Sequence, residues 1–372
     1  PTVVWTDRET RADRARRRSF SLVITPSCHD HASASPVSYA ASMDEIVSIG
    51  TNSAVLDLGG EIMHLQGLEP DTHVSLSGLH FRTLKSAGAL LSRVVTMNDV
   101  HFGETKCGEI EGITGAALEV EPGEEPYPMT MNRSVCDDAN ELQPDAVIVK
   151  GDLTNSGKPE EFQAFLDCYV GTFGDKVAFV RGNHDSYHAE GFADTPVQII
   201  DTQGLRTVLI DTARSREVGG FLSTAQLDAI AAAAASTEST VIVMGHHPLV
   251  LPEAPADGHR SMNKKDSLAF MEVALAHQNV VAYTAGHTHR CRRVEVSGIS
   301  VIDVASVKDF PGVFAEYQVR EEGIVQILHR ASAPAAISWA EKTAQMFAGL
   351  YRDYAMGALE DRSFVLPRRQ PS

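Results

Sequence analysis

The stretch VAFVRGNHD, residues 177–185, decides the fold because it joins a fully apolar tetrapeptide to a run of polar residues. Four further apolar runs also lead into segments rich in Asp, Asn or His, and they occupy residues 94–97, 146–149, 241–244 and 280–283. Short apolar runs that alternate with helix-like segments are typical of α/β architecture. Because ligands bind beyond the carboxyl ends of strands in open α/β sheets, we expect the polar ends to form one site.

The side chains at these strand ends are of the types that bind metal ions. A single Asp-x-His, Gly-Asp or His-His-Pro is usually structural, but five such ends in one chain argue against that interpretation. The donors are, in chain order, Asp99, His101, Asp152, Asn183, His246, His287 and His289. Carboxylate, amide and imidazole donors suit Mn, Fe, Zn or Co without any thiolate. Seven donors exceed the needs of one ion but suit two ions, about 3.5–4 Å apart, that share a carboxylate.

These five blocks, which span about residues 94–290, resemble the calcineurin-like metallophosphoesterase family. Flanking segments at residues 210–212 and 220–227 are similar to its bacterial branch that contains class III cyclic-nucleotide phosphodiesterases. The resemblance implies a four-layer α/β/β/α sandwich with a dinuclear centre at one edge of two mixed sheets. It also implies that a metal-bound hydroxide attacks phosphorus in line.

The resemblance implies a role for each donor. The first metal would be held by Asp99, His101 and His289, and the second by Asn183, His246 and His287. Asp152 would bridge the two ions, which would be Mn, Fe or Zn.

Four neighbouring residues complete the predicted site. His184 is expected to stabilise the transition state or to protonate the leaving oxygen. Asp185 would either orient His184 or cap its own loop. His247 is expected to lie beside the ligands and to contact substrate, with a packed histidine as the alternative. Asn155 occupies the position of the iron-binding Tyr of purple acid phosphatases, which disfavours that type, and it could contact substrate or brace its loop.

The function that follows is hydrolysis of a small-molecule phosphodiester, with 3',5'-cyclic nucleotides among the candidate substrates. Phosphomonoester hydrolysis at the same site is one alternative. A binding or scaffold protein that uses its amino-terminal region is another, although such members typically lose metal ligands. The net charge of −17 disfavours a nuclease of the repair type. A homodimer is expected by analogy.

The segments between the apolar runs predict the helices. We expect helices over residues 159–170 and 224–235, the second opened by a capping box at Ser223. A second capping box predicts one long helix over residues 338–359. Residues 103–140 are acidic, contain Gly and Pro, and show no clear periodicity, so they predict a surface excursion near the site.

The amino-terminal part reads as a separate β unit. Strand-like segments occur at residues 3–5, 20–24 and 54–58, and the end of this part resembles a fibronectin type III sandwich, with Val74 in place of the usual Tyr. We therefore expect three regions: a small β domain at residues 1–88, the phosphoesterase domain at 89–334 and a helical tail at 335–372.

Composition sets limits on the remaining functions. The 372 residues include no apolar run near the ~18 residues that a membrane-spanning helix needs. An acidic chain repels a phosphate backbone, so no nucleic-acid partner is expected. The five cysteines are scattered and form no CxxC pair, which favours free thiols. Arg17 and Arg18 resemble an export signal, but the apolar run that follows is too short, so a cytoplasmic location is predicted.

Overall fold

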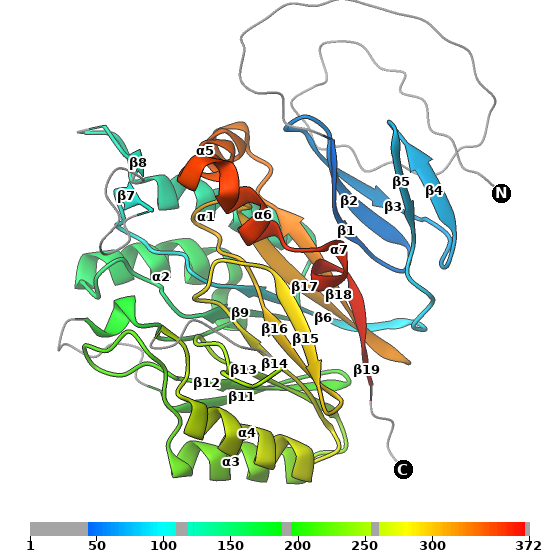
Figure 1. Ribbon diagram of the computed structural model, residues 1–372, viewed down its shortest axis with the longest axis vertical. Coiled ribbons are helices and arrows are strands. Elements are labelled where there is room, and N and C mark those ends of the chain that lie inside the picture. Colours follow the sequence, from blue (N-terminus) through cyan, green and yellow to red (C-terminus); the bar gives the residue numbers. More distant parts are fainter. Residues whose placement is uncertain (1–43, 109–117, 122, 188–194, 254–259, 369–372) are drawn as a thin grey trace, which may run out of the picture.

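The computed structural model describes residues 44–108, 118–121, 123–187, 195–253 and 260–368, which form two six-stranded mixed sheets and flanking helices (Figure 1). In spatial order the first sheet contains β10 (Val177–Val180), β9 (Ala146–Lys150), β6 (Leu90–Met97), β17 (Val313–Arg320), β18 (Gly323–Arg330) and β19 (Phe364–Pro367). The second contains β11 (Val197–Thr202), β12 (Leu205–Ile210), β13 (Thr240–Met244), β14 (Val280–Ala285), β16 (Ile299–Asp303) and β15 (Arg292–Val296). All five apolar runs are therefore strands, as predicted.

The parallel strands of each sheet fix where their following loops lie. In the first sheet β6, β9 and β10 run parallel, and in the second β12, β13, β14 and β16 do so. Most of their valines, isoleucines and alanines are buried, as expected for strands covered from both sides, whereas the edge strand β10 is only half-buried before Val180. The loops after β6, β9, β10, β13 and β14 consequently leave from carboxyl ends, which is where the predicted ligands lie.

Helices cover the outer faces of the two sheets. They are α1 (Tyr127–Glu141), α2 (Pro159–Phe173), α3 (Thr224–Ala235), α4 (Lys264–Ala276), α5 (Pro334–Ala344), α6 (Leu350–Met356) and α7 (Leu359–Arg362). One core includes α1, α2 and the first sheet, and another includes α3, α4 and the second sheet. Helix α3 has the predicted bounds and the predicted Ser223 cap, whose Oγ accepts from the Gln226 amide. The mixed α/β fold is confirmed.

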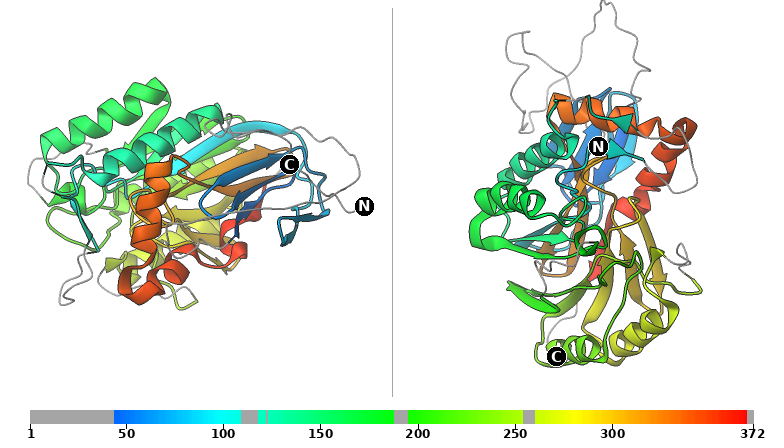
Figure 2. Two further views of the ribbon diagram at one scale, coloured as in Figure 1. Left: turned by 90° about the horizontal axis from the view of Figure 1, so that it is seen from above. Right: turned by 90° about the vertical axis from the view of Figure 1, so that its left-hand side faces the viewer.

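The amino-terminal strands form two small antiparallel sheets. They are β1 (Glu45–Ile49), β2 (Ser53–Asp57) and β3 (Ile62–Gln66), then β4 (His73–Leu76) with β5 (Leu79–Arg82). They enclose a small core of their own and lie at the opposite end of the molecule from α3 and α4 (Figures 1 and 2). The strand predicted at 54–58 is present, whereas those at 3–5 and 20–24 lie outside the described residues.

The prediction that residues 103–140 are a surface excursion is wrong for their second half. After the short hairpin of β7 (Lys106–Cys107) and β8 (Leu118–Glu119), residues 127–141 form α1. Its buried Tyr127, Met131 and Val135 recur every four residues and face the core. Polar residues that are also buried, such as Asn132, dilute this apolar stripe, and the sequence pattern therefore concealed it.

The single helix predicted over residues 338–359 is also wrong. Helix α5 begins four residues earlier, at Pro334, because proline is well suited to the first turn of a helix. The chain then breaks at Phe347 and Ala348, whose φ angles are 54° and 59°, and continues as α6. The tail finally adds β19 to the first sheet, antiparallel to β18.

Two expectations drawn from composition agree with the structure. Cys107, Cys136, Cys168 and Cys291 are free thiols. Among the described residues, no helix combines the length and the apolar character that crossing a bilayer would require.

Candidate metal centre

The loops that carry the predicted ligands have an unusual backbone. Five of these residues adopt left-handed φ angles between 45° and 67°, and they are Asp99, His101, Asp152, His287 and His289. Side chains other than Gly rarely adopt this conformation, which costs of the order of 1–3 kcal/mol per residue and is concentrated at functional sites. In these loops, the backbone adopts an unfavourable conformation that directs the side chains toward the predicted site.

Two glycines allow these loops to approach one another closely. A Cβ atom on Gly151 would lie 2.7 Å from the ring of His246, and one on Gly286 would lie 2.6 Å from the Asp99 carboxylate. Both distances are shorter than real carbon contacts allow, so only glycine permits this packing. The Gly residues at the strand ends thus bring the two sheets' loops together.

One group of ligands, the Asp99 cluster, consists of Asp99, His101 and His289. Their ligand atoms all lie within 4.8 Å of one another. His289 Nε2 is 3.3 Å from Asp99 Oδ1. Burial raises the pKa of Asp99, but the charges of His289 and His246 outweigh it and hold that pKa well below its usual range. The cluster therefore presents an ionised carboxylate and two imidazoles to one point.

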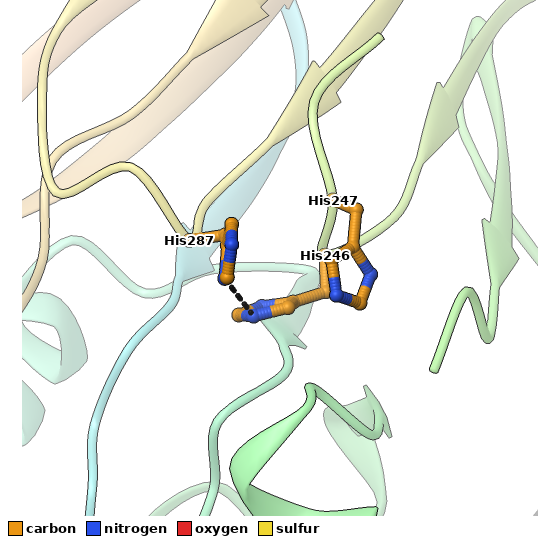
Figure 3. Close-up of side chains that lie close together, drawn as sticks. All are labelled: His246, His247 and His287. Atoms are coloured by element: carbon orange, nitrogen blue, oxygen red, sulfur yellow. Dashed lines mark hydrogen bonds between the residues drawn. The ribbon is translucent and has the colours of Figure 1, made fainter. Parts of the chain in front are cut away.

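The second group, the His246 cluster, consists of Asn183, His246 and His287. His246 Nε2 lies 3.2 Å from Asn183 Oδ1 and also 3.2 Å from His287 Nδ1, the contact drawn in Figure 3. An imidazole nitrogen that faces both another imidazole nitrogen and an amide oxygen is the arrangement expected of ligands around a cation.

Asp152 stands between the two clusters. Its Oδ2 atom is 3.3 Å from His101 Nε2 and 3.4 Å from His246 Nε2. Burial raises the pKa of Asp152, but His246 and His184 offset this and hold it well below the usual range. A single ionised oxygen therefore faces one imidazole from each cluster.

The donors fit a pair of cations. Both ring nitrogens of His101 are buried and lack a partner in hydrogen-bond geometry, although carboxylate oxygens lie nearby. Leaving a buried polar nitrogen unpaired is costly, and a bound cation would satisfy Nε2, while Nδ1 faces the Glu104 carboxylate. Around His289, burial lowers the pKa, but Asp309 and Asp99 raise it to about 10. The electrostatic environment of this ring thus favours a positive charge.

His184 lies at the edge of the centre, where its ring meets that of His101 edge to face at 4.5 Å between centroids. Its Nδ1 is 2.6 Å from the Asn155 carbonyl oxygen, and its backbone amide donates to Asp152 Oδ1. Burial lowers the pKa of His184 to about 4, so the isolated ring is neutral and Nδ1 carries the proton that the carbonyl accepts.

The Asp185 carboxylate contacts the backbone of two loops. Its carboxylate accepts hydrogen bonds from the amides of Gly182, Leu153 and Thr154 and from the Thr154 hydroxyl, at 2.6–3.0 Å. Burial, followed by the nearby Asp152 charge, raises the pKa of Asp185 to about 6. This geometry matches the loop-capping alternative.

His247 and Asn155, predicted to contact substrate, both make fold contacts. His247 is fully buried, with Nδ1 2.8 Å from the Thr212 hydroxyl and Nε2 3.0 Å from the Val218 carbonyl. It lies beside His246 and His287 (Figure 3), but both of its nitrogens are occupied, as the packed-histidine alternative requires. The backbone amide of Asn155 donates to the Phe102 carbonyl, and its carbonyl accepts from His184, which are the contacts expected of a residue that braces the loop after Asp152.

Several residues that support the ligands were missed in the sequence. Glu104 Oε2 lies 3.0 Å from His101 Nδ1, and Asp309 Oδ2 lies 3.1 Å from His289 Nδ1. The Lys150 carbonyl lies 2.9 Å from His246 Nδ1. Only Glu104, three residues after His101, carried a signal in its spacing, because Asp309 comes from the loop between β16 and β17.

The structure combines two mixed sheets with Asp, Asn and His side chains at the ends of their strands. This combination is typical of α/β proteins that bind metal ions. The sequence model of the calcineurin-like phosphoesterases matches residues 92–291, more than half of the chain. The chain therefore belongs to the calcineurin-like phosphoesterase family. The predicted family is therefore confirmed, and membership in it implies a dinuclear metal site.

The individual relatives share less than 30% sequence identity with this chain. A probable cyclic nucleotide phosphodiesterase of Synechococcus is 29% identical over 40% of this chain and 58% of its own length. The glycerophosphodiester phosphodiesterase of Enterobacter lignolyticus is 28% identical over 42% and 61%. The chain thus spans less than two thirds of these relatives. A dimetal phosphatase from Danio rerio shares the fold, with a TM-score of 0.52 at 17% identity, over 64% of this chain and 96% of that one.

Proposed function

We propose that this protein is a dinuclear metal-dependent phosphodiesterase that acts on small phosphodiesters, with 3',5'-cyclic nucleotides as the favoured substrates. The observation that carries the proposal is the position of Asp152 Oδ2, which faces one imidazole of the Asp99 cluster and one of the His246 cluster at nearly equal distances. A shared carboxylate of this kind is the feature that divides seven donors between two ions.

The Asp99 cluster would hold one ion, the His246 cluster the other, and Asp152 would bridge them. When bound, two divalent ions supply Lewis-acid polarisation of the phosphoryl oxygens and activate a water for in-line displacement. Mn, Fe and Zn all suit these donors. The residues themselves would keep the two ions close together, because the carboxylates of Asp99 and Asp152 are held ionised.

His184 is the residue best suited to act on the leaving oxygen. Its Nδ1 donates to the Asn155 carbonyl, so the ring is fixed in one orientation. A phosphodiester anion beside the ring would raise the low pKa of His184, since a nearby negative charge favours the protonated imidazole. His184 would then donate its Nε2 proton to the departing alkoxide.

The choice of substrate class rests on the relatives. A probable cyclic nucleotide phosphodiesterase and a glycerophosphodiester phosphodiesterase both match this chain, and both act on diesters. We therefore favour diesters over monoesters. A scaffold role is less well supported, because the chain keeps a side chain of ligand type at all seven positions.

The test is hydrolysis by the Mn²⁺-loaded protein, with metal content measured on the same sample. The substrates are bis(p-nitrophenyl) phosphate, p-nitrophenyl phosphate and 3',5'-cyclic AMP. We expect faster turnover of the diesters than of the monoester, and loss of activity with EDTA that added Mn²⁺ restores. Preference for the monoester would favour the phosphatase alternative. A protein that binds no more than one ion per chain would contradict the dinuclear assignment.

Three broader expectations stay proposals. We propose domain boundaries near residues 88 and 335, with a fibronectin-like amino-terminal unit and a four-layer catalytic domain. We also propose a homodimer and a cytoplasmic location.

A further inference from the structure

The carboxyl-terminal helix α6 directly contacts Asp309, the residue that faces His289 of the Asp99 cluster. The Tyr351 hydroxyl of α6 donates a 2.9 Å hydrogen bond to Asp309 Oδ1. The other oxygen of Asp309 lies 3.1 Å from His289 Nδ1. A continuous chain of contacts therefore runs from α6 through one carboxylate to a predicted metal ligand.

Two more contacts join α6 to the loop that carries His287 and His289. The Tyr354 hydroxyl donates to the Thr288 carbonyl at 2.9 Å, between the two ligands. The Cys291 amide, just after the loop, donates to the Ala355 carbonyl at 2.8 Å. The loop is thus held by α6 at its middle and at its end, in addition to the contact through Asp309.

His289 depends on such support more than His101 does. The His289 side chain is 20% exposed, whereas that of His101 is 2% exposed and confined by packing. Within the part of the chain that the structure describes, the donors to Asp309 Oδ1 are the hydroxyls of Tyr351 and Ser306. Burial raises the pKa of Tyr351 well above its usual value, so this phenol remains a donor at all ordinary pH values.

We propose that α6 is a positioning element of the metal centre, in which Tyr351 fixes Asp309 and Asp309 fixes the ring of His289. The inference rests on the proposed dinuclear function. It adds that affinity for one ion depends on a helix outside residues 92–291, the part of the chain that matches the family. Tyr351 and Asp309 act through His289 and are positioning residues, not catalytic ones.

The test is a Co²⁺ titration of the metal-free protein, in which binding is measured by calorimetry and by visible absorption. Removal of a group that orients a metal-bound histidine typically costs about 10–100-fold in metal affinity. For Tyr351→Phe we expect the lower end, about 10-fold, in one of two binding steps, with the other step unchanged. Asp309→Asn, which weakens the contact with His289 itself, should cost more at the same step.

Tyr317→Phe is the matched control, because it also removes a buried tyrosine hydroxyl, one that donates across the two sheets from β17 to Thr284 of β14 at 3.4 Å. It should leave both binding steps unchanged. The thermal midpoint of each metal-free variant separates a positioning effect from a loss of folding. Should Tyr351→Phe fail to fold, Asp309→Asn decides the question by the same titration.

The outcomes separate the two proposals. Two wild-type binding steps that Tyr351→Phe and Asp309→Asn leave unchanged would overturn the positioning role and leave the dinuclear function standing. Equal weakening of both steps, together with a lower metal-free thermal midpoint, would also overturn it, because the effect would then be one of folding. A wild-type protein without two binding steps would overturn the dinuclear function and the positioning role together.

Discussion

The two ligand clusters are supported in different ways. In the Asp99 cluster both imidazoles face carboxylates, since His101 lies 3.0 Å from Glu104 and His289 lies 3.1 Å from Asp309. In the His246 cluster, His246 Nδ1 faces an uncharged partner, the backbone carbonyl of Lys150. Carboxylate partners raise the basicity of a metal-bound imidazole more than carbonyls do. The comparison teaches that the two sites are electrostatically unequal, and we expect the Asp99 cluster to hold its ion more tightly.

Lys308 moderates this difference. Its ammonium group lies 2.6 Å from Glu104, and both groups are buried. Burial raises the pKa of Glu104, but the charges of Lys308 and His101 outweigh it and bring it well below its usual range. Part of the negative charge near His101 is therefore neutralised, whereas the Asp309 carboxylate faces His289 directly.

The largest effect is expected from Asp152→Ala, which should weaken both sites together because Asp152 faces one imidazole of each cluster. Losing the shared carboxylate weakens both sites, so kcat should fall by about 10³-fold or more. Metal content should fall from two ions per chain toward zero. Asp175→Ala, at an exposed acidic residue after α2, is the control and should change neither. Turnover within 10-fold of wild type would contradict the bridging role.

The next effect is expected from Asn183→Ala, which weakens the His246 cluster alone. The variant loses the amide oxygen that lies 3.2 Å from His246 Nε2. We expect kcat to fall by about 10²-fold, comparable to the loss of one transition-state contact. Metal analysis should show that the more tightly held ion remains. Loss of both ions in equal measure would show that the clusters are not independent.

The sequence predicts the metal ligands better than it predicts the residues that hold those ligands in place. The predicted ligands follow apolar strands. Because parallel strands end at the same edge of a sheet, the sequence predicts that these side chains lie close to one another. Asp309 lies 20 residues beyond His289, and Tyr351 lies farther still. No periodicity links either residue to the strand ends, because Asp309 comes from the loop between β16 and β17 and Tyr351 from the tail, and both meet the site only in the folded chain.

The errors in the fold have a similar physical origin. Local signals sufficed for α3, where Ser223 and Gln226 cap each other. They failed for α1, where Asn132 is buried because it donates to the Val100 and Pro128 carbonyls. They failed again at Phe347 and Ala348, where two residues other than glycine adopt a left-handed conformation that breaks the helix. Sequence patterns therefore located the centre better than the structures that support it.

A smaller effect is expected from Glu104→Gln combined with Lys308→Met, which makes the support of His101 neutral. The single change Glu104→Gln should destabilise the protein by about 3–5 kcal/mol, because it leaves the buried Lys308 charge unpaired. The double variant should recover most of that stability, as measured by urea unfolding. It should still bind one ion about 10-fold more weakly than wild type. Wild-type affinity for both ions would show that Glu104 serves the fold alone.

The smallest effect is expected from Asn155→Ala, which touches neither cluster. The contacts of Asn155 with Phe102 and His184 use its backbone, and alanine retains them. We therefore expect kcat to stay within about 2-fold of wild type, which corresponds to a barrier change of less than about 0.5 kcal/mol. Measuring kcat and KM for bis(p-nitrophenyl) phosphate decides between the two predicted roles. A large rise in KM at constant kcat would show that the Asn155 side chain binds substrate, since loss of uniform binding has that signature.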